Sequence, residues 1–277
     1  MTDYPWGALG LNLALSAAAA LLVLLATFAV AVVRGGRHRT VDIAWGLGFA
    51  AVALTTFAAS AGEGDTARRT LIAVLTVVWG VRLAGHVTWR SWGKGEDPRY
   101  ERMLAKAPGH PQLYALRMVY LLQAALVWLI SLPLQFGAYL PGPLGWVVVL
   151  GIACWAVGLF FEALGDWQMH RFKSDPANRG KIMDRGLWSL TRHPNYFGDF
   201  MVWWGLFLVA AGTWQVAAIT VVSPLVMSFL LIFGSGKRLT EKTMSQRDGF
   251  DRYAARTSGF FPLPPRRNAR PEDGPRP

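Results

Sequence analysis

The chain has 277 residues, of which 53% are hydrophobic and 16% are charged, and its formal net charge is +11. Soluble globular domains are less apolar and more highly charged, so this composition excludes an ordinary soluble fold. On such a hydrophobic chain, the basic excess indicates orientation in a membrane and contact with anionic lipid, and we expect no nucleic-acid partner.

Apolar segments predict seven membrane-spanning helices. The first, at 8–33, contains 26 residues without a charge. At about 1.5 Å per residue, this is enough to cross a hydrocarbon core of about 30 Å. The others follow at 43–62, 70–89, 116–136, 144–165, 195–213 and 215–235. We expect an all-α transmembrane bundle that forms one domain over 1–261, with a disordered Pro/Arg-rich cytoplasmic tail over 262–277.

The distribution of basic residues predicts the orientation of this bundle. The connections after the first, third and fifth spans, together with Arg117 at the border of the fourth span and the C-terminal region, hold 25 of the 28 Lys and Arg residues. The alternate connections hold only Arg68 and Arg69, and Arg82 lies within a span. The positive-inside rule therefore predicts an outside N-terminus and a cytoplasmic C-terminus. We expect a multi-pass protein of a bacterial-type inner membrane whose active site faces the cytoplasm.

Ionisable residues lie inside the second and third predicted spans, where a charge costs at least about 2.5–3.5 kcal/mol. Asp42 opens the second span, while Arg82 and His86 share one face of the third. Asp42 could simply cap its helix, and Arg82 could snorkel or anchor a carboxylate. We expect an acidic group or a cofactor phosphate beside Arg82, with Asp42 as a suitable protein partner.

A polar stripe ends the fifth predicted span, where Glu162, Asp166 and His170 recur every four residues. The stripe lacks a Glu-x-x-His pair and a fourth ligand, so we expect no metal there. Carboxylates at a water-exposed helix end also suit the hydroxyl groups of a ribose.

The segment 184–199 holds the densest group of polar residues. Arg192 and His193 precede a helix start at Pro194-Asn195, and Asp199 follows one turn later. Basic side chains beside a helix N-terminus favour an anion. A lipid phosphate would satisfy the basic residues alone, whereas Asn195 and Asp199 favour a bound nucleotide.

The run Gly186–Asp199, Gly-Leu-Trp-Ser-Leu-Thr-Arg-His-Pro-Asn-Tyr-Phe-Gly-Asp, resembles the C-terminal cofactor signature of the steroid 5-alpha-reductase and sterol reductase superfamily. The whole chain looks like an uncharacterised bacterial membrane branch of that superfamily. The motifs of this branch are Asp-Ile-Ala-Trp-Gly (42–46), Trp-Gly-Val-Arg-Leu (79–83) and Gly-Glu-Asp-Pro-Arg-Tyr (95–100).

The resemblance implies a membrane reductase that uses NADPH to reduce a carbon–carbon double bond conjugated to a carbonyl. It places Glu162 and Asp166 at the ribose, and Asn195 and Asp199 at the nicotinamide carboxamide. Lys173, Lys181 and Arg192 would lie along the phosphates. A Rossmann domain is excluded because no Gly-x-Gly-x-x-Gly follows a strand.

The substrate side of the predicted site involves Asp42, Arg82, His86 and Tyr100. The steroid reductases grip the substrate carbonyl with a Glu and a Tyr; Asp42 could replace the Glu, but Trp79 stands nearest the Tyr position. Asp42, His86 and Tyr100 are candidates for the acid that stabilises or protonates the developing enolate. We expect a flat, lipophilic substrate that enters between spans.

Two other functions remain open. The Arg192–Gly198 run and Arg238-Leu-Thr-Glu241 also resemble motifs of isoprenylcysteine carboxyl and phospholipid methyltransferases, which use S-adenosylmethionine. The third alternative is a non-catalytic membrane scaffold. The convergence of ionisable residues on one side favours an enzyme, and the Glu96-Asp-Pro-Arg-Tyr100 loop favours the reductase.

Overall fold

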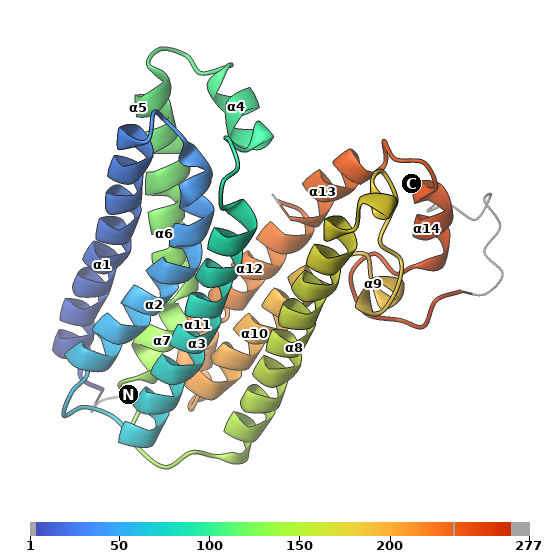
Figure 1. Ribbon diagram of the computed structural model, residues 1–277. Coiled ribbons are helices and arrows are strands. Elements are labelled where there is room, and N and C mark those ends of the chain that lie inside the picture. The colour runs from blue at the N-terminus through green and yellow to red at the C-terminus, as the bar shows by residue number, and fades with distance from the viewer. Residues whose placement is uncertain (1–3, 235, 267–277) are drawn as a thin grey trace. The chain divides into compact units, whose positions relative to one another are not determined.

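The computed structural model describes residues 4–234 and 236–266. Within these ranges the regular secondary structure is helical, and the β contact is an isolated bridge between Thr191 and Ser258 (Figure 1). The chain divides into two compact units. Unit 1 comprises Met1–Val149 and Leu206–Ser223; unit 2 comprises Leu150–Gly205 and Pro224–Pro277.

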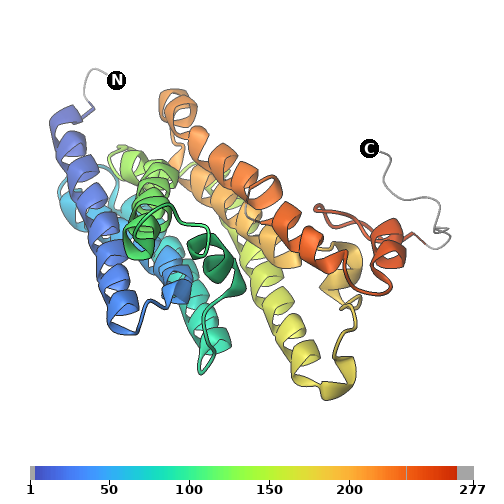
Figure 2. The ribbon, with the colours of Figure 1, turned by 90° about the horizontal axis from the view of Figure 1, so that it is seen from above.

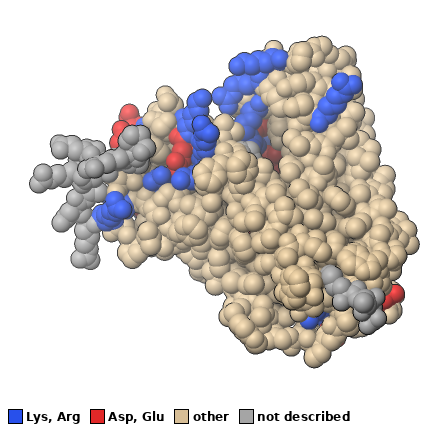
Figure 3. Space-filling view, turned by 180° about the vertical axis from the view of Figure 1, so that it is seen from behind, with Lys and Arg blue, Asp and Glu red and all other residues tan. Residues whose placement is uncertain are grey.

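Six helical segments are long and apolar enough to cross a membrane, so the protein is a multi-pass membrane protein. Much of the surface in Figure 3 accordingly carries no charged side chain. The segments are Trp6–Val33, His38–Ala59, Thr66–Ser91, Pro111–Gly137, Trp146–Ser174 and Trp214–Met244.

The sixth predicted span, 195–213, is not among these segments and corresponds to helix α10 (Pro194–Ala210). Its 17 residues span about 26 Å at about 1.5 Å per residue, slightly less than a hydrocarbon core of about 30 Å. The helix exists where the sequence predicts it, and its membrane crossing stays a prediction.

Unit 1 is built around the long helices α1, α2 and α3 and the shorter α6, which run beside one another in Figure 1. A π-helical turn, η2, precedes α6, and Pro133, which lacks an N–H, lies in the first turn of α7. The predicted span 116–136 is therefore several joined helical pieces. The elements of this unit are α1 (Trp6–Val33), η1 (His38–Thr40), α2 (Val41–Ala59), α3 (Thr66–Ser91), α4 (Pro98–Leu104), α5 (Pro111–Ala115), η2 (Leu116–Leu121), α6 (Leu122–Ile130), α7 (Leu132–Gly137) and α11 (Trp214–Thr220).

Unit 2 contains most of three long helices, α8, α10 and α12, which lie side by side in Figure 2. The indole N–H of Trp204 on α10 donates to the Ser228 hydroxyl on α12, 3.2 Å away. Shorter helices follow at the C-terminal end of the unit. Its elements are α8 (Trp146–Ser174), η3 (Pro176–Asn178), α9 (Leu187–Leu190), α10 (Pro194–Ala210), α12 (Val222–Ile232), α13 (Lys237–Met244) and α14 (Phe250–Arg256).

The two arginines of the predicted outer connection are buried in unit 1, with 4% and 7% of their surface exposed. The Arg69 guanidinium donates to the carbonyl of Phe57, near the end of α2, at 2.7 Å. That of Arg68 donates to the carbonyl of Val209, near the end of α10, at 3.1 Å. Both cations therefore satisfy carbonyls at helix C-termini, where the helix dipole favours positive charge.

The beginning of the predicted tail contacts unit 2. The amide of Leu263 donates to the Leu190 carbonyl, and the amide of Arg266 donates to the Arg256 carbonyl, each at 3.0 Å. The remaining residues of the predicted tail, 267–277, lie outside the described part of the chain.

Candidate functional site

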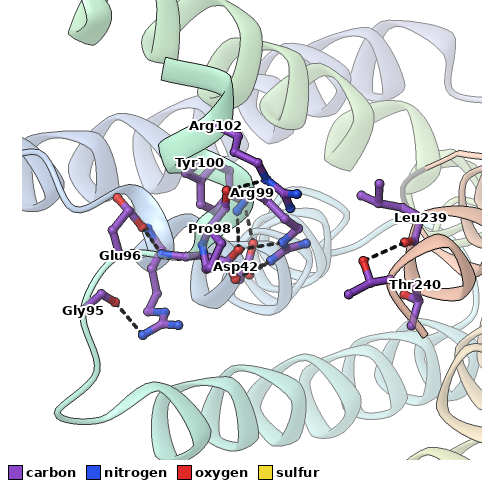
Figure 4. A network of polar contacts seen from close by, with 12 residues as sticks. Asp42, Gly95, Glu96, Pro98, Arg99, Tyr100, Arg102, Leu239 and Thr240 are labelled. Atoms are coloured by element: carbon purple, nitrogen blue, oxygen red, sulfur yellow. Dashed lines mark hydrogen bonds and ion pairs between the residues drawn. The ribbon is translucent and has the colours of Figure 1, made fainter. Parts of the chain in front are cut away.

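A polar network joins the start of α2 to the short helix α4 in unit 1 (Figure 4). The Tyr100 hydroxyl donates to one carboxylate oxygen of Asp42 at 2.7 Å, and the Arg99 guanidinium donates to the other at 2.7 Å. Tyr100 is buried, whereas Arg99 is exposed over 44% of its side chain. Residues from two family motifs, 42–46 and 95–100, thus form one site.

Glu96 fixes the loop that carries this network. Its carboxylate accepts hydrogen bonds from the backbone N–H groups of Arg39, at 2.8 Å, and of His38, at the entrance to α2. The Arg39 guanidinium returns a bond to the Gly95 carbonyl at 2.6 Å. The first N–H groups of a helix lack partners within the helix. A carboxylate at this position accepts hydrogen bonds from them and is also attracted to the positive end of the helix dipole. This cap holds the loop beside Asp42.

The charged side chains of Asp97 and Arg99 stabilise each other's ionised form. Burial works to raise the pKa of Asp97, but hydrogen bonds from Arg99 and the charges of Arg99 and Arg39 outweigh it and lower that pKa. The pKa of Arg99 is raised although burial opposes it, chiefly by its hydrogen bond to Asp97 and the charge of Asp42. Burial, followed by the charge and hydrogen bond of Asp42, raises the pKa of Tyr100. Tyr100 is therefore a neutral phenol that donates a hydrogen bond.

Helices α2 and α3 cross at two glycines from the motifs 42–46 and 79–83. A Cβ atom on Gly46 would overlap the carbonyl oxygen of Gly80, and the reverse holds for Gly80. Next to this crossing, the buried Trp79 ring meets Phe49 edge-on at 5.5 Å. The two glycines permit a backbone approach that any side chain would prevent. This contact brings the third motif against the helix that carries Asp42.

Two further predicted residues of the substrate side lie on α3. Arg82 and His86 are both half-buried, and the His86 ring lies 6.3 Å from that of Trp89. The two bonds to Asp42 described above both come from α4, and the expected pairing of Asp42 with Arg82 stays a prediction.

In unit 2, the predicted ribose residues lie where α10 crosses α8. Glu162 and Asp166 are 3% and 8% exposed, and the Asn195 amide donates to an Asp166 oxygen at 3.5 Å. A Cβ atom on Gly158 would lie 2.6 Å from the Val202 amide nitrogen, so a glycine permits this close crossing. Two carboxylates and a carboxamide from separate helices are thus brought together.

Arg192 joins the start of α10 to the C-terminal helices of unit 2. Its Nε donates to Glu241 of α13 at 2.8 Å, and its Nη1 donates to the carbonyls of Thr257, at 2.8 Å, and Ala254, at 3.1 Å. The imidazole Nε2 of His193 lies 3.1 Å from the same Glu241 oxygen. Two of the three guanidinium nitrogens of Arg192, Nε and Nη1, are therefore occupied by hydrogen bonds within unit 2. Glu241 connects the two methyltransferase-like motifs.

His193 is 1% exposed, and its ring stacks on Tyr196 with centroids 5.3 Å apart. Burial lowers the pKa of His193; the hydrogen bond and charge of Glu241 oppose this effect, while the cations Arg192 and Lys237 add to it. Burial and two neighbouring cations both favour the neutral imidazole.

The remaining predicted cofactor residues differ in exposure. Asp199 is half-buried on α10, one turn after Asn195, while Lys173 at the end of α8 and Lys181 in the next loop are exposed. Sequence reasoning assigned no role to Glu96 and connected Glu241 only with the methyltransferase alternative. Glu96 belongs to a recognisable motif, but nothing in the local sequence indicates that its carboxylate caps the backbone. Nothing in the local sequence indicates the partners of Glu241 either.

Among the residues that the structure describes, no three His, Cys, Asp or Glu side chains come together as a candidate metal site. The polar groups of both sites can form hydrogen bonds with an organic ligand.

Comparisons with known proteins connect these motifs to a family. The model of the family described as "Protein of unknown function (DUF1295)" matches residues 27–257. The Delta(14)-sterol reductase erg24 of Schizosaccharomyces pombe is 34% identical over 102 residues, covering 31% of this chain and 24% of the relative. The probable O-methyltransferase ustE of Ustilaginoidea virens is 40% identical over 62 residues, covering 22% of each chain. The matches thus span about a quarter of these curated relatives, and no solved structure matches.

Proposed function

Because the chain belongs to the steroid 5-alpha-reductase-like family DUF1295, we propose that it is a membrane-embedded, NADPH-dependent reductase. Its substrate is a lipophilic molecule with a carbon–carbon double bond conjugated to a carbonyl, as in a lipid or a steroid-like compound. The partial match to a sterol reductase supports this class of reaction.

The observation that carries the proposal is the group of Glu162, Asp166 and Asn195 at the crossing of α8 and α10. Two buried carboxylates can accept hydrogen bonds from vicinal ribose hydroxyls, and a carboxamide can both donate and accept. A purely lipid-facing crossing does not require these groups, because each costs free energy unless it is hydrogen-bonded. The residues therefore fit a nucleotide cofactor.

In the proposed cofactor site, Glu162 and Asp166 hold the ribose, and Asn195 and Asp199 hold the carboxamide end. The exposed Lys173 and Lys181 lie along the phosphates. Arg192 contributes differently: its Nε and Nη1 are already bonded to the protein, so it positions the start of α10 and offers its remaining nitrogen, Nη2.

NADPH, when bound, supplies the hydride that adds to the β-carbon of the substrate. An acid must then stabilise the enolate oxygen or protonate the α-carbon. Tyr100 is a neutral hydroxyl whose single proton is donated to Asp42 in this structure, so in this role Tyr100 turns that proton from Asp42 to the enolate oxygen when substrate binds. Arg99 keeps the Asp42 carboxylate paired. His86 is the second candidate acid, and we assign Arg82 to the orientation of this side of the site.

The proposed reductase is one transmembrane domain over 1–261, with a tail from 262 to 277. It has seven spans in a bacterial inner membrane, an outside N-terminus and a cytoplasmic active site. The burial of Arg68 and Arg69 supports this orientation, because neither acts as a free charge in an outer loop.

A methyltransferase is the second candidate, and one contact favours it. Glu241 binds both Arg192 and His193, so the two motifs that resemble methyltransferases meet in space. The match to a probable O-methyltransferase supports the same class.

Binding of the two cofactors to detergent-purified protein separates these functions. Isothermal titration with NADPH and with S-adenosylmethionine should give saturable heat for NADPH alone. Reversed selectivity would replace the reductase proposal with the methyltransferase. NADP⁺ serves as a control for the nucleotide scaffold, since it retains the ribose and phosphate groups.

A further inference from the structure

Two cations converge on Gly259 in unit 2. A Cβ atom at this glycine would lie 2.9 Å from Lys237 Nζ and 3.2 Å from Arg192 Nη2. The ammonium and guanidinium groups are therefore no more than about 6 Å apart. At this separation they repel each other, and the repulsion is stronger at a partly buried site than in water.

The acidic groups of the protein neutralise the charges of Lys237 and Arg192 only in part. The Glu241 carboxylate binds Arg192 through Nε, not through the Nη2 that faces Gly259, and it is shared with His193. Within residues 4–234 and 236–266, Lys237 makes no ion pair. Both cations also lower the pKa of the adjacent His193, which indicates a positive potential around them.

The glycine itself keeps the space between these groups. Gly259 is not among the glycines with a left-handed φ, so its backbone conformation does not demand glycine. Its neighbours are instead the ends of the two cationic side chains, which a Cβ atom at this position would displace. Two residues earlier, Thr257 has a buried hydroxyl without a hydrogen-bond partner in the described chain, and Arg192 holds the carbonyl of this residue.

We propose that Lys237, Arg192 Nη2 and Gly259 form a binding site for a phosphate group. A guanidinium and an ammonium supply charge-assisted donors to phosphate oxygens, and the missing side chain at 259 admits the anion. Lys237 is a new ligand in this assignment. The site rests on the proposed function only if the phosphate belongs to the cofactor; a lipid headgroup or free phosphate offers the same chemistry.

Isothermal titration with inorganic pyrophosphate tests the site in the full-length, detergent-purified protein. Lys237→Ala and Gly259→Ala should each weaken binding about tenfold or more, since one removes a charge-assisted bond and the other fills the site. Lys237→Arg should retain binding, and Lys242→Ala, on the exposed part of the same helix, is the matched control. Unchanged affinity in both Lys237→Ala and Gly259→Ala overturns the proposal. Thermal unfolding checks each variant's fold, and if Gly259→Ala does not fold, Lys237→Ala decides.

Competition identifies the source of the phosphate. Displacement of pyrophosphate by NADPH assigns the site to the cofactor, whereas displacement only by nanodiscs that contain phosphatidic acid assigns it to a lipid headgroup. Pyrophosphate binding without any NADPH binding leaves the phosphate site standing and removes the reductase proposal. NADPH binding that is insensitive to Lys237→Ala, with no pyrophosphate binding, removes the phosphate site and leaves the reductase proposal.

Discussion

Asn195 is the residue at which the proposed cofactor site can be tested with the least disturbance. Its side chain reaches Asp166 only through a long hydrogen bond of 3.5 Å, so its removal should leave the crossing of α8 and α10 intact. Asn195→Ala should weaken NADPH binding by about 1–3 kcal/mol, the cost of leaving a buried polar partner without its bond. Titration calorimetry measures the change.

The control for this variant is Asn178→Ala, in the loop after α8, which should bind NADPH like the unmodified protein. An unchanged affinity in Asn195→Ala, with measurable binding by the parent protein, would contradict the role assigned to this amide.

His193 should make stability depend on pH. Its pKa is lowered in the folded protein, so the unfolded chain binds a proton more readily. Stability is therefore highest above the unfolded pKa of about 6.5 and falls as pH drops below that value. We expect the melting temperature in detergent to decrease between about pH 6.5 and pH 5.

The quantity to compare between variants is the slope of melting temperature against pH, not the absolute melting temperature. His193→Gln should flatten it, because the titrating group is gone. His110→Gln removes an exposed histidine and should preserve the slope. Equal slopes in the parent protein and His193→Gln would show that other groups cause the effect.

At the scale of elements, the crossing of α2 and α3 depends on Gly46. In Gly46→Ala the added methyl group would meet the backbone of Gly80, which cannot move without separating the helices. Overpacking of this kind costs about 1–3 kcal/mol, so the melting temperature should fall. The network around Asp42 should loosen with it, since α2 carries that residue.

Gly85 on α3 provides a matched control, since a Cβ atom there meets nothing within 4 Å. Gly85→Ala should be neutral or stabilising, by up to about 1 kcal/mol, because alanine favours a helix interior. Equal melting temperatures for Gly46→Ala and Gly85→Ala would mean that close packing at Gly46 is not needed.

For the whole molecule, the prediction concerns topology. Reporter fusions at Gly62, Gly142 and Gly212 should report the outside of the cell. The burial of Arg68 and Arg69 strengthens the expectation, because nearly all the other basic residues belong to the predicted inner connections. Fusions at Gly95, Gly180 and Pro262 should report the cytoplasm.

The fusion at Gly142 is decisive for the number of spans. A cytoplasmic signal at Gly142 would contradict the predicted orientation of the four spans that precede it. A cytoplasmic signal at Gly212 together with an outside signal at Pro262 would mean that α10 does not cross. The 17-residue length of α10 makes the second comparison informative.

The sequence alone determined that the protein is a helical membrane protein of a reductase-like family. Long apolar runs leave few alternatives, because every backbone polar group in a bilayer must be satisfied within a helix or a closed barrel. Family motifs are similarly local, so 42–46, 79–83, 95–100 and 186–199 could be read before any contact was known.

Tertiary structure alone decided which of these motifs meet and what each polar side chain binds. Asp42 is held by residues 57 and 58 positions away, and Glu241 by residues 48 and 49 positions away. Neither separation follows a helical period, so no local pattern marks either pairing. Gly259 gains its significance only from two side chains distant in the chain. Such contacts depend on how the loops pack against the helices, and this packing is determined by contacts between residues far apart in the chain.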